Sequence, residues 1–255
     1  MKQTFILAQK SFRGNLRNKI FVTFFIFAML LVLVSILFEA LTFTAKLKII
    51  KDVGMAGVSI FSALIAIFLS GEAIVGEMER KTVYTLLSKP VDRKDFILGS
   101  FLGVVLTTGV AILISGGVLL FLIYVKQGFL ESGLFLALIF IGLEITVITS
   151  IGIMFSSFCS SSLTSSFLCF LVYILGHLNT QLSIMAKMVE SKIVKTLISF
   201  ARWVLPNLEY FNIREKIVQG QLIHPEYTAR VVLYTFFYSA ICLTIAWIIF
   251  KRREL

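Results

Sequence analysis

The sequence lacks the motifs of the common enzyme classes. No GxxxxGK[ST] phosphate-binding loop occurs in its 255 residues, so we do not expect this chain to hydrolyse ATP by itself. It also contains no HExxH zinc motif, no GxSxG nucleophile elbow and no pair of carboxylates at catalytic spacing. We therefore expect no catalytic residue and no cofactor or metal bound by this chain.

Residues that form disulfides or bind metals are scarce. The three cysteines, Cys159, Cys169 and Cys242, lie in or beside apolar stretches, and an odd number argues against a disulfide framework. We interpret them as small residues of a membrane interior. The two histidines, His177 and His224, lie far apart in sequence, and we interpret His177 as a polar residue at an interface or facing a helix bundle.

Charge is also sparse. Charged residues make up 15% of the chain and hydrophobic residues 58%, with a mean hydropathy of +0.95. A soluble domain of this length does not need so large an apolar fraction, whereas a membrane protein does. The net charge of +10 does not indicate nucleic acid, because the basic residues flank apolar runs. There they set membrane topology and meet anionic lipid headgroups.

Six apolar runs predict an all-α membrane protein with six transmembrane helices. About 20 residues cross the hydrocarbon core, and the expected spans are 20–38, 54–75, 96–125, 134–155, 163–182 and 231–250. The third is longer than a bilayer needs, so we expect it to tilt or to project beyond the membrane. A long loop, 179–230, follows the fifth span, and 184–203 within it has the spacing of a second interfacial helix that ends at Pro206.

Residues 1–19 predict a separate helix on the membrane surface. Its apolar face would enter the lipid while its cations stay at the headgroups. The two faces hold Phe5, Ala8, Phe12 and Leu16 on one side and Lys10, Arg13 and Arg17 on the other. A plain positive-inside signal is the alternative, and both can hold.

The basic residues also predict the orientation. Of the 24 Lys and Arg residues, thirteen lie on the side of the termini, four in the two short opposite loops and seven in the long fifth loop. Long loops count less in setting orientation. We therefore expect both termini and the 77–99 stretch in the cytoplasm, and the 179–230 loop outside it.

The stretch 77–99, EMERKTVYTLLSKPVDRKDFILG, has the most ordered pattern between spans. Val83, Leu86, Leu87 and Pro90 share one face of a short helix. Pro90 would end that helix near Lys89. A new helix would then start, with Asp92 as its cap and Asp95 three residues on. Two helices meeting at a fixed corner would make a lever; an ordinary charged loop is the alternative.

Two polar features inside the apolar sequence also stand out. Glu144 lies near the middle of the fourth span, where a charge costs about 3 kcal/mol by insertion scales. It is either a residue of a substrate or proton path, or the partner of an interhelical hydrogen bond with Thr107, Thr108 or Ser115. Seven serines and a threonine crowd into 156–166 and predict a tight polar turn.

The 77–99 stretch resembles the permease subunits of ABC-2-type ABC transporters, and most closely the branch related to permeases associated with multicopper-enzyme maturation. Their block has the form E-x-E-R-K-T-x-Y-x-L-L-x-K-P-V-x-R, followed by a glycine at the third span. This chain supplies Glu77, Glu79, Arg80, Lys81, Thr82, Tyr84, Leu87, Lys89, Pro90, Val91, Arg93 and Gly99. A second match is LPNLEYFNIRE, 205–215, and the six-span layout extends the resemblance over essentially the whole chain. No Met, Cys or His cluster supports a role in copper chemistry.

The resemblance implies a permease domain over 20–255, with a coupling helix in 77–95 that docks on a separate ATPase. Two ATPase copies would bind ATP and Mg²⁺, and the permease would pair with itself or with a related chain in the bacterial inner membrane. The implied docking residues are Glu77, Glu79, Arg80, Lys81, Thr82, Tyr84, Leu86, Leu87, Lys89, Pro90 and Arg93. The serine-rich turn is a candidate second contact, since the ridge of Val83, Leu86 and Leu87 is small for a stable interface.

Two other functions fit the residues. An ion-coupled carrier would use Glu144 as its proton or cation site, although the inverted halves and broken helices of many carriers are not evident. A membrane scaffold without transport would use the same docking surface to assemble a complex. The sequence does not identify a substrate or a direction of transport.

Overall fold

The computed structural model describes residues 2–40, 46–79, 92–179, 181, 195–196, 205–214, 217 and 223–252. Within these ranges the chain forms helices and no strand. In chain order they are α1 (Lys2–Leu16), α2 (Lys19–Ala40), α3 (Lys46–Glu72), α4 (Val75–Glu79), α6 (Arg93–Gln127), α7 (Ser132–Phe158), α8 (Ser162–His177), the 3-10 helix η1 (Leu208–Phe211) and α12 (Pro225–Arg252). The predicted all-α architecture is confirmed for this part of the chain.

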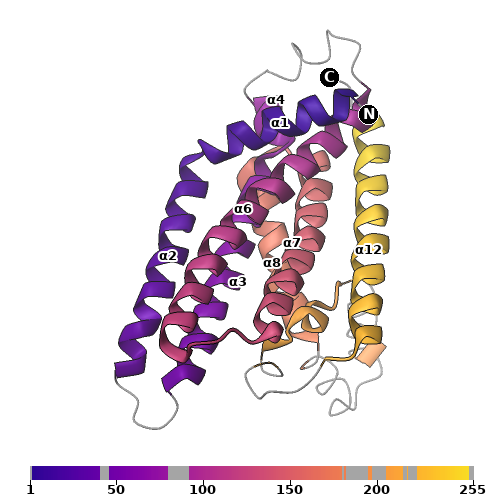
Figure 1. Cartoon of the computed structure of the whole chain (residues 1–255). Helices are drawn as coiled ribbons and strands as arrows, with labels where there is room; N and C mark the ends of the chain where they lie inside the picture. The colour runs from indigo at the N-terminus through magenta and orange to yellow at the C-terminus, as the bar shows by residue number, and fades with distance from the viewer. Residues whose placement is uncertain are drawn as a thin grey trace.

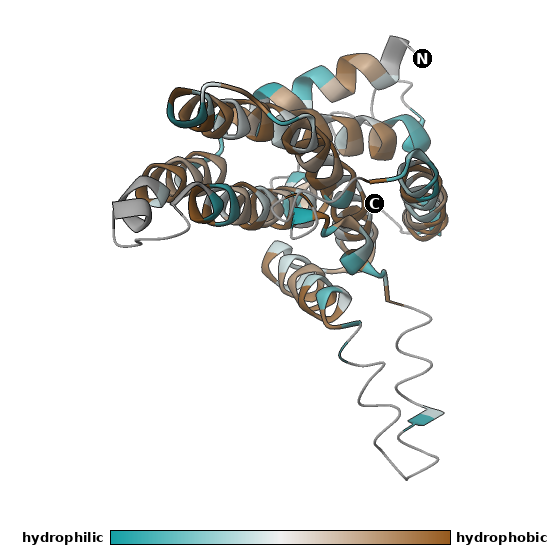
Figure 2. Ribbon diagram, turned by 60° about the horizontal axis from the view of Figure 1, so that its bottom comes forward, coloured by the Kyte–Doolittle hydropathy of each residue, from teal (hydrophilic) through white to brown (hydrophobic). Residues whose placement is uncertain are grey.

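The long helices run side by side, and α1 crosses the end of the bundle at which α12 finishes (Figure 1). Apolar residues cover most of the long helices (Figure 2). Four of the described helices, α3, α6, α7 and α12, are each long and apolar enough to cross a membrane. A fifth span results if α1 and α2, which meet at a bend of 64°, count as one. α8 is apolar but has 16 residues, so six spans stay a prediction.

The predicted boundaries are closest for the uninterrupted apolar runs. α2, α6, α7 and α12 each contain their expected span with one to six extra residues at each end. The second span differs, because α3 begins at Lys46 instead of 54. Lys51 therefore lies inside a helix and not in a loop, and its buried ammonium group pairs with Glu131 at 2.7 Å. That pair lets the helix continue through a charged residue.

The N-terminal helix α1 packs against the start of α6, and Gly99 and Gly103 make the close approach possible. These glycines are four residues apart and share one face of α6. A Cβ on Gly99 would lie 2.6 Å from the Leu7 Cβ, and one on Gly103 would overlap Ser11. Ala8 is buried in this contact, whereas Phe5 is exposed. The expectation that Ala8 and Phe5 enter lipid on one face was therefore wrong for Ala8.

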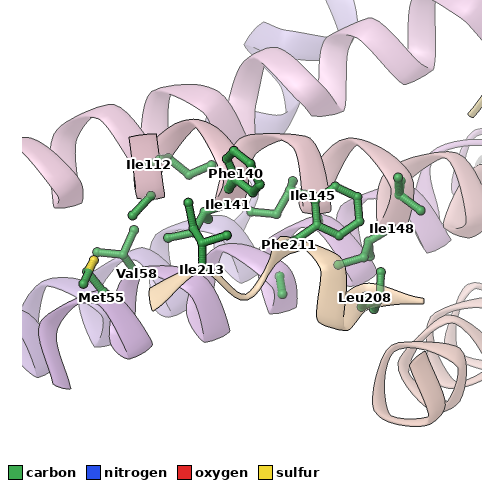
Figure 3. Packing of buried hydrophobic residues seen from close by; sticks show 14 of the residues in the cluster. Met55, Val58, Ile112, Phe140, Ile141, Ile145, Ile148, Leu208, Phe211 and Ile213 are labelled. Carbon is green, nitrogen blue, oxygen red and sulfur yellow. The ribbon is translucent and has the colours of Figure 1, made fainter. Parts of the chain in front are cut away.

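The segment after 205 returns into the bundle and completes its core. η1 buries Leu208 and Phe211, and Ile213 follows them into the interior. Figure 3 shows these side chains directed at α7, among Phe140, Ile141, Ile145 and Ile148. Two tyrosines of α12 hold the segment in place: Tyr227 donates to the Tyr210 carbonyl at 2.7 Å, and the Tyr234 hydroxyl accepts from the Asn207 amide at 3.0 Å.

Candidate coupling site and a buried polar pocket

The short helix α4 leads from α3 into the predicted coupling segment, and Ser156 of α7 fixes its start. The first amides of a helix have no partner within the helix. Here the Ser156 Oγ accepts hydrogen bonds from the Ile74 and Val75 amides, both at 3.1 Å, and donates to the Gly71 carbonyl at 2.8 Å. Ser156 is fully buried. One side chain thus satisfies both sides of the break between α3 and α4.

Small residues let the ends of α3, α7 and α8 meet closely around this break. A Cβ on Gly71 would lie 2.9 Å from the Ser166 Cα, and one on Gly152 would lie 2.7 Å from the Ser70 Cβ. Within the serine-rich turn, four serines are buried inside the protein: Ser156, Ser157, Ser165 and Ser166. Only the middle of the turn, with Ser160 exposed, is open to a second protein. The predicted second contact with an ATPase can involve that part alone.

The two acidic residues of α4 bind neighbouring helices. The Glu77 carboxylate lies 3.6 Å from the Lys10 ammonium group on α1. The Glu79 carboxylate accepts hydrogen bonds from the backbone amide and the hydroxyl of Ser162, each at 3.3 Å. These contacts tie the entry of the coupling segment to α1 and α8. Docking on a partner by either glutamate stays a prediction.

Arg93 ties the exit of the same segment to the end of α12. Its Nη1 donates to the carbonyls of Phe250 and Lys251, at 2.8 and 2.9 Å. The guanidinium group also lies over the Phe250 ring at 5.7 Å, and Phe96 stacks on that ring at 5.8 Å. Because the last carbonyls of a helix are unpaired within it and carry partial negative charge, a cation is favourable there. The described contacts of Arg93 are thus within this chain.

Asp92 occupies the N-cap position of α6, as predicted, with extended backbone angles. Its side chain makes no capping hydrogen bond. Asp95 serves α1 instead, because it accepts a hydrogen bond from the Thr4 hydroxyl at 2.6 Å. The predicted capping pair is therefore correct in position and wrong in its contacts.

Most of the predicted docking residues lie in 80–91, outside the described residues. They are Arg80, Lys81, Thr82, Tyr84, Leu86, Leu87, Lys89 and Pro90. The structure describes both ends of this segment, each joined to a different set of helices by the contacts above.

Glu144 is buried in the middle of α7, and its partner is His177 at the end of α8. The Glu144 Oε1 lies 3.0 Å from the His177 Nε2. Tyr173, one turn earlier on α8, meets the imidazole edge to face with ring centres 4.8 Å apart. A buried carboxylate needs such a partner, since an isolated charge is costly away from water. The pair joins α7 to α8 inside the bundle.

A cavity of about 220 Å³ opens beside this pair. Polar groups from α3, α7, α8 and the segment after η1 converge there on an otherwise apolar wall. Arg214 is one of them, and its Nε lies 2.9 Å from the Asp52 carboxylate. The residues around the cavity are Met55, Ser59, Ile60, Ala137, Ile141, Glu144, Tyr173, His177, Phe211, Asn212, Ile213 and Arg214.

The predicted partners of Glu144 bond elsewhere. The hydroxyls of Thr107, Thr108 and Ser115 each donate to a carbonyl of α6 itself, three or four residues earlier. The sequence analysis did not predict that His177 and Glu144 are partners. Two ionisable residues inside neighbouring apolar runs are a signal that could have paired them.

The comparisons with known proteins agree with the helical architecture. A family model described as ABC-2 family transporter protein matches residues 5–255. The curated proteins give no match. Among the described residues, no group of three or more His, Cys, Asp and Glu side chains is placed to hold a metal ion.

Proposed function

Because the chain belongs to the ABC-2 family of transporter proteins, we propose that it couples ATP hydrolysis by a separate ATPase subunit to the movement of a substrate across the membrane. The family supplies the transmembrane permease of an ABC transporter, a multi-pass protein without a catalytic site of its own. In this proposal the segment 77–95 carries the coupling helix. ATP and Mg²⁺ bind to the partner.

The observation that carries the proposal is the anchoring of that segment at both ends. Its entry is bound to α1, α7 and α8 through Glu77, Ser156 and Glu79. Its exit is bound to α12 through Arg93. A protein that pushes on the ridge of Val83, Leu86 and Leu87 between these ends would act on several membrane helices at once. That arrangement suits a coupling element better than an ordinary charged loop.

We further propose two ATPase copies, a permease dimer of identical or related chains, and a bacterial inner membrane with both termini in the cytoplasm. The basic residues support this orientation, because α1, the described ends of the 77–95 segment (α4 and the start of α6) and the end of α12 lie at one end of the bundle (Figure 1). An ATPase on that side would meet all three.

The test is affinity purification of the tagged chain in mild detergent, with mass spectrometry of the proteins that copurify. We expect a stoichiometric partner with a GxxxxGK[ST] loop. Leu86→Asp should lose this partner, because a buried carboxylate on the docking ridge stays desolvated and unpaired. Leu86→Met, which keeps the apolar surface, should retain it.

Two controls separate docking from folding. Glu144→Gln, which lies in the middle of α7 and outside the 77–95 segment, should retain the ATPase. Leu86→Asp should elute from gel filtration as a monodisperse membrane protein, like the parent. An ATPase that binds Leu86→Asp as well as the parent would contradict the docking role. Purification without any ATPase would contradict the coupling proposal and favour a carrier that uses Glu144.

We propose that the cavity beside Glu144 lies on the substrate path. The support is its convergence of charged and polar groups at the middle of α7, where such groups are costly unless they serve a purpose. In reconstituted vesicles, Glu144→Gln should lower substrate-stimulated ATPase activity by tenfold or more while basal ATPase activity persists. Thr146→Val, two residues away on α7, is the control. If substrate stimulates the ATPase activity of Glu144→Gln and of the parent equally, the Glu144–His177 pair is only a structural contact.

A further inference from the structure

A second and larger hollow lies on the side of the bundle, between α6, α7 and α12. Its volume is about 710 Å³ and its wall is mostly apolar. Lys94 of the 77–95 segment lines it, but none of the predicted docking residues and none of the residues around the Glu144 cavity is among its described lining residues. The lining residues are Lys94, Ile97, Leu98, Phe101, Leu143, Thr146, Val232, Thr235, Phe236, Ser239, Ala240, Leu243, Thr244 and Trp247. We call it the lateral groove.

The end of the lateral groove beside the coupling segment is cationic. The Lys94 ammonium group lies 4.2 Å from the centre of the Trp247 ring, and the Lys251 ammonium group lies 5.7 Å from it. Lys94 lines the groove, and Lys251 lies beside it, one turn beyond Trp247 on α12, so two positive charges lie near one aromatic ring where α6 begins and α12 ends. Of the nearby carboxylates that the structure describes, Asp95 accepts a hydrogen bond from the Thr4 hydroxyl of α1, and Asp92 is exposed at the cap of α6.

The long axis of the groove follows α12 into the membrane. Its lining residues on this helix run from Val232 to Trp247, about 22 Å at 1.5 Å per residue. One leaflet of a 30 Å hydrocarbon core is about 15 Å deep, so the groove reaches past the centre of the bilayer. Tryptophan and lysine are the residues that mark the level of the headgroups. The groove thus has the polarity of a phospholipid, with a charged end at the interface and an apolar end in the core.

We propose that the lateral groove binds one phospholipid with an anionic headgroup. Its phosphate lies between Lys94 and Lys251, and an acyl chain follows the apolar wall past Leu243 and Phe236. Since apolar contacts alone do not distinguish one lipid from another in a bilayer, the selectivity comes from the two lysines. Each basic residue at a membrane surface gives about a fivefold preference for an anionic lipid. This proposal is independent of the ATPase partner.

The test uses the fluorescence of Trp247. The sequence has two tryptophans, so Trp203→Phe leaves Trp247 as the single emitter. This variant is reconstituted in phosphatidylcholine vesicles that contain increasing fractions of either phosphatidylglycerol or phosphatidylcholine with brominated acyl chains. We expect half-maximal quenching by the phosphatidylglycerol at a fraction about 25-fold lower, since two lysines each contribute about fivefold. Lys94→Gln and Lys251→Gln should each weaken this preference about fivefold, and together they should abolish it.

Matched controls keep the result specific to the groove. Lys19→Gln removes a cation at the same end of the bundle but outside the groove, and it should leave the preference unchanged. Brominated phosphatidylcholine should quench all variants alike, which shows that the ring still faces lipid. Equal quenching by the two lipids in the parent would overturn the proposal. A second result would also overturn it: neither lipid quenches Trp247, and an Ala240→Cys variant forms a disulfide between two copies of the chain. A second chain would then occupy the groove.

Discussion

The hydroxyl of Ser156 donates a hydrogen bond to the carbonyl of Gly71 at 2.8 Å, across 85 positions of sequence. The same oxygen accepts from the two amides that begin α4. The chain turns from a membrane helix toward the coupling segment at this point, so the last turn of α7 sets the direction in which the segment leaves the bundle.

Ser156→Ala should therefore destabilise the protein and weaken coupling. Two buried amides and one carbonyl lose their partner, and an unsatisfied buried polar group costs about 1–3 kcal/mol. Thermal unfolding in detergent should show a lower Tm, and stimulation of the ATPase should fall. Ser160→Ala is the matched control, because Ser160 is exposed in the same turn. The role assigned to Ser156 is wrong if Ser156→Ala and Ser160→Ala have the same Tm.

A larger side chain at Gly103 should lift α1 from α6. A Cβ there already overlaps Ser11, and overpacking costs about 1–3 kcal/mol. Docking of α1 on α6 can be followed by the formation of a disulfide in the double variant Thr4→Cys, Asp95→Cys. The Thr4 Oγ1 and the Asp95 Oδ1 are 2.6 Å apart, so the two side chains are in contact. We expect Gly103→Val to reduce the yield of this disulfide. Gly109→Val should leave it unchanged, because a Cβ at Gly109 meets nothing within 4 Å.

Glu144 and His177 should be energetically coupled. In a double-mutant cycle with Glu144→Gln and His177→Gln, the unfolding free energies should deviate from additivity by about 0.5–3 kcal/mol. A parallel cycle with Glu144→Gln and Ser115→Ala should be additive, because Ser115 donates to the Ala111 carbonyl on its own helix. Equal coupling in both cycles would show that the effect spreads through packing and not through the pair.

The ion pair of Lys51 and Glu131 should make stability depend on pH. The hydrogen bond from Lys51, aided by one from Gln127, lowers the pKa of the Glu131 carboxyl below its ordinary value of 4.5. A lowered folded-state pKa contributes stability that is present above pH 4.5 and is lost as the pH falls through the folded pKa. We expect the Tm advantage of the parent over Glu131→Gln to be constant near neutral pH and to shrink in acid. A constant difference down to pH 3 would contradict this contribution.

Sequence patterns predicted the helices that an apolar run defines. The runs that became α2, α6, α7 and α12 are long because a bilayer is thick, and this property is local and visible in hydropathy. The charged start of α3 was missed, since the burial of Lys51 inside a helix is compensated by its pairing with Glu131, which is 80 residues away. Hydropathy and periodicity are evaluated over short segments of sequence, so they cannot reveal a pair of residues this far apart.

The burial of the segment after 205 was also missed. Its apolar residues, Leu208, Phe211 and Ile213, are separated by polar ones, and no helix or strand period joins them. Only its resemblance to a family motif marked this stretch. Similarly, the serine-rich turn was predicted to be a tight polar turn and a candidate second contact for a partner protein. Four of its serines are buried inside the protein instead, and Gly71 leaves the room that Ser166 occupies between α3 and α8.

The crossing of α1 over Gly99 and Gly103 has a consequence for motion. Where backbones approach without large side chains between them, the helices cannot slide freely past one another. α1 continues into α2 through a bend of 64°, and α2 stands at the opposite edge of the bundle from α12 (Figure 1). A tilt of α6 would thus be carried over the top of the bundle to α2. The N-terminal helix would then mechanically connect α6 to α2.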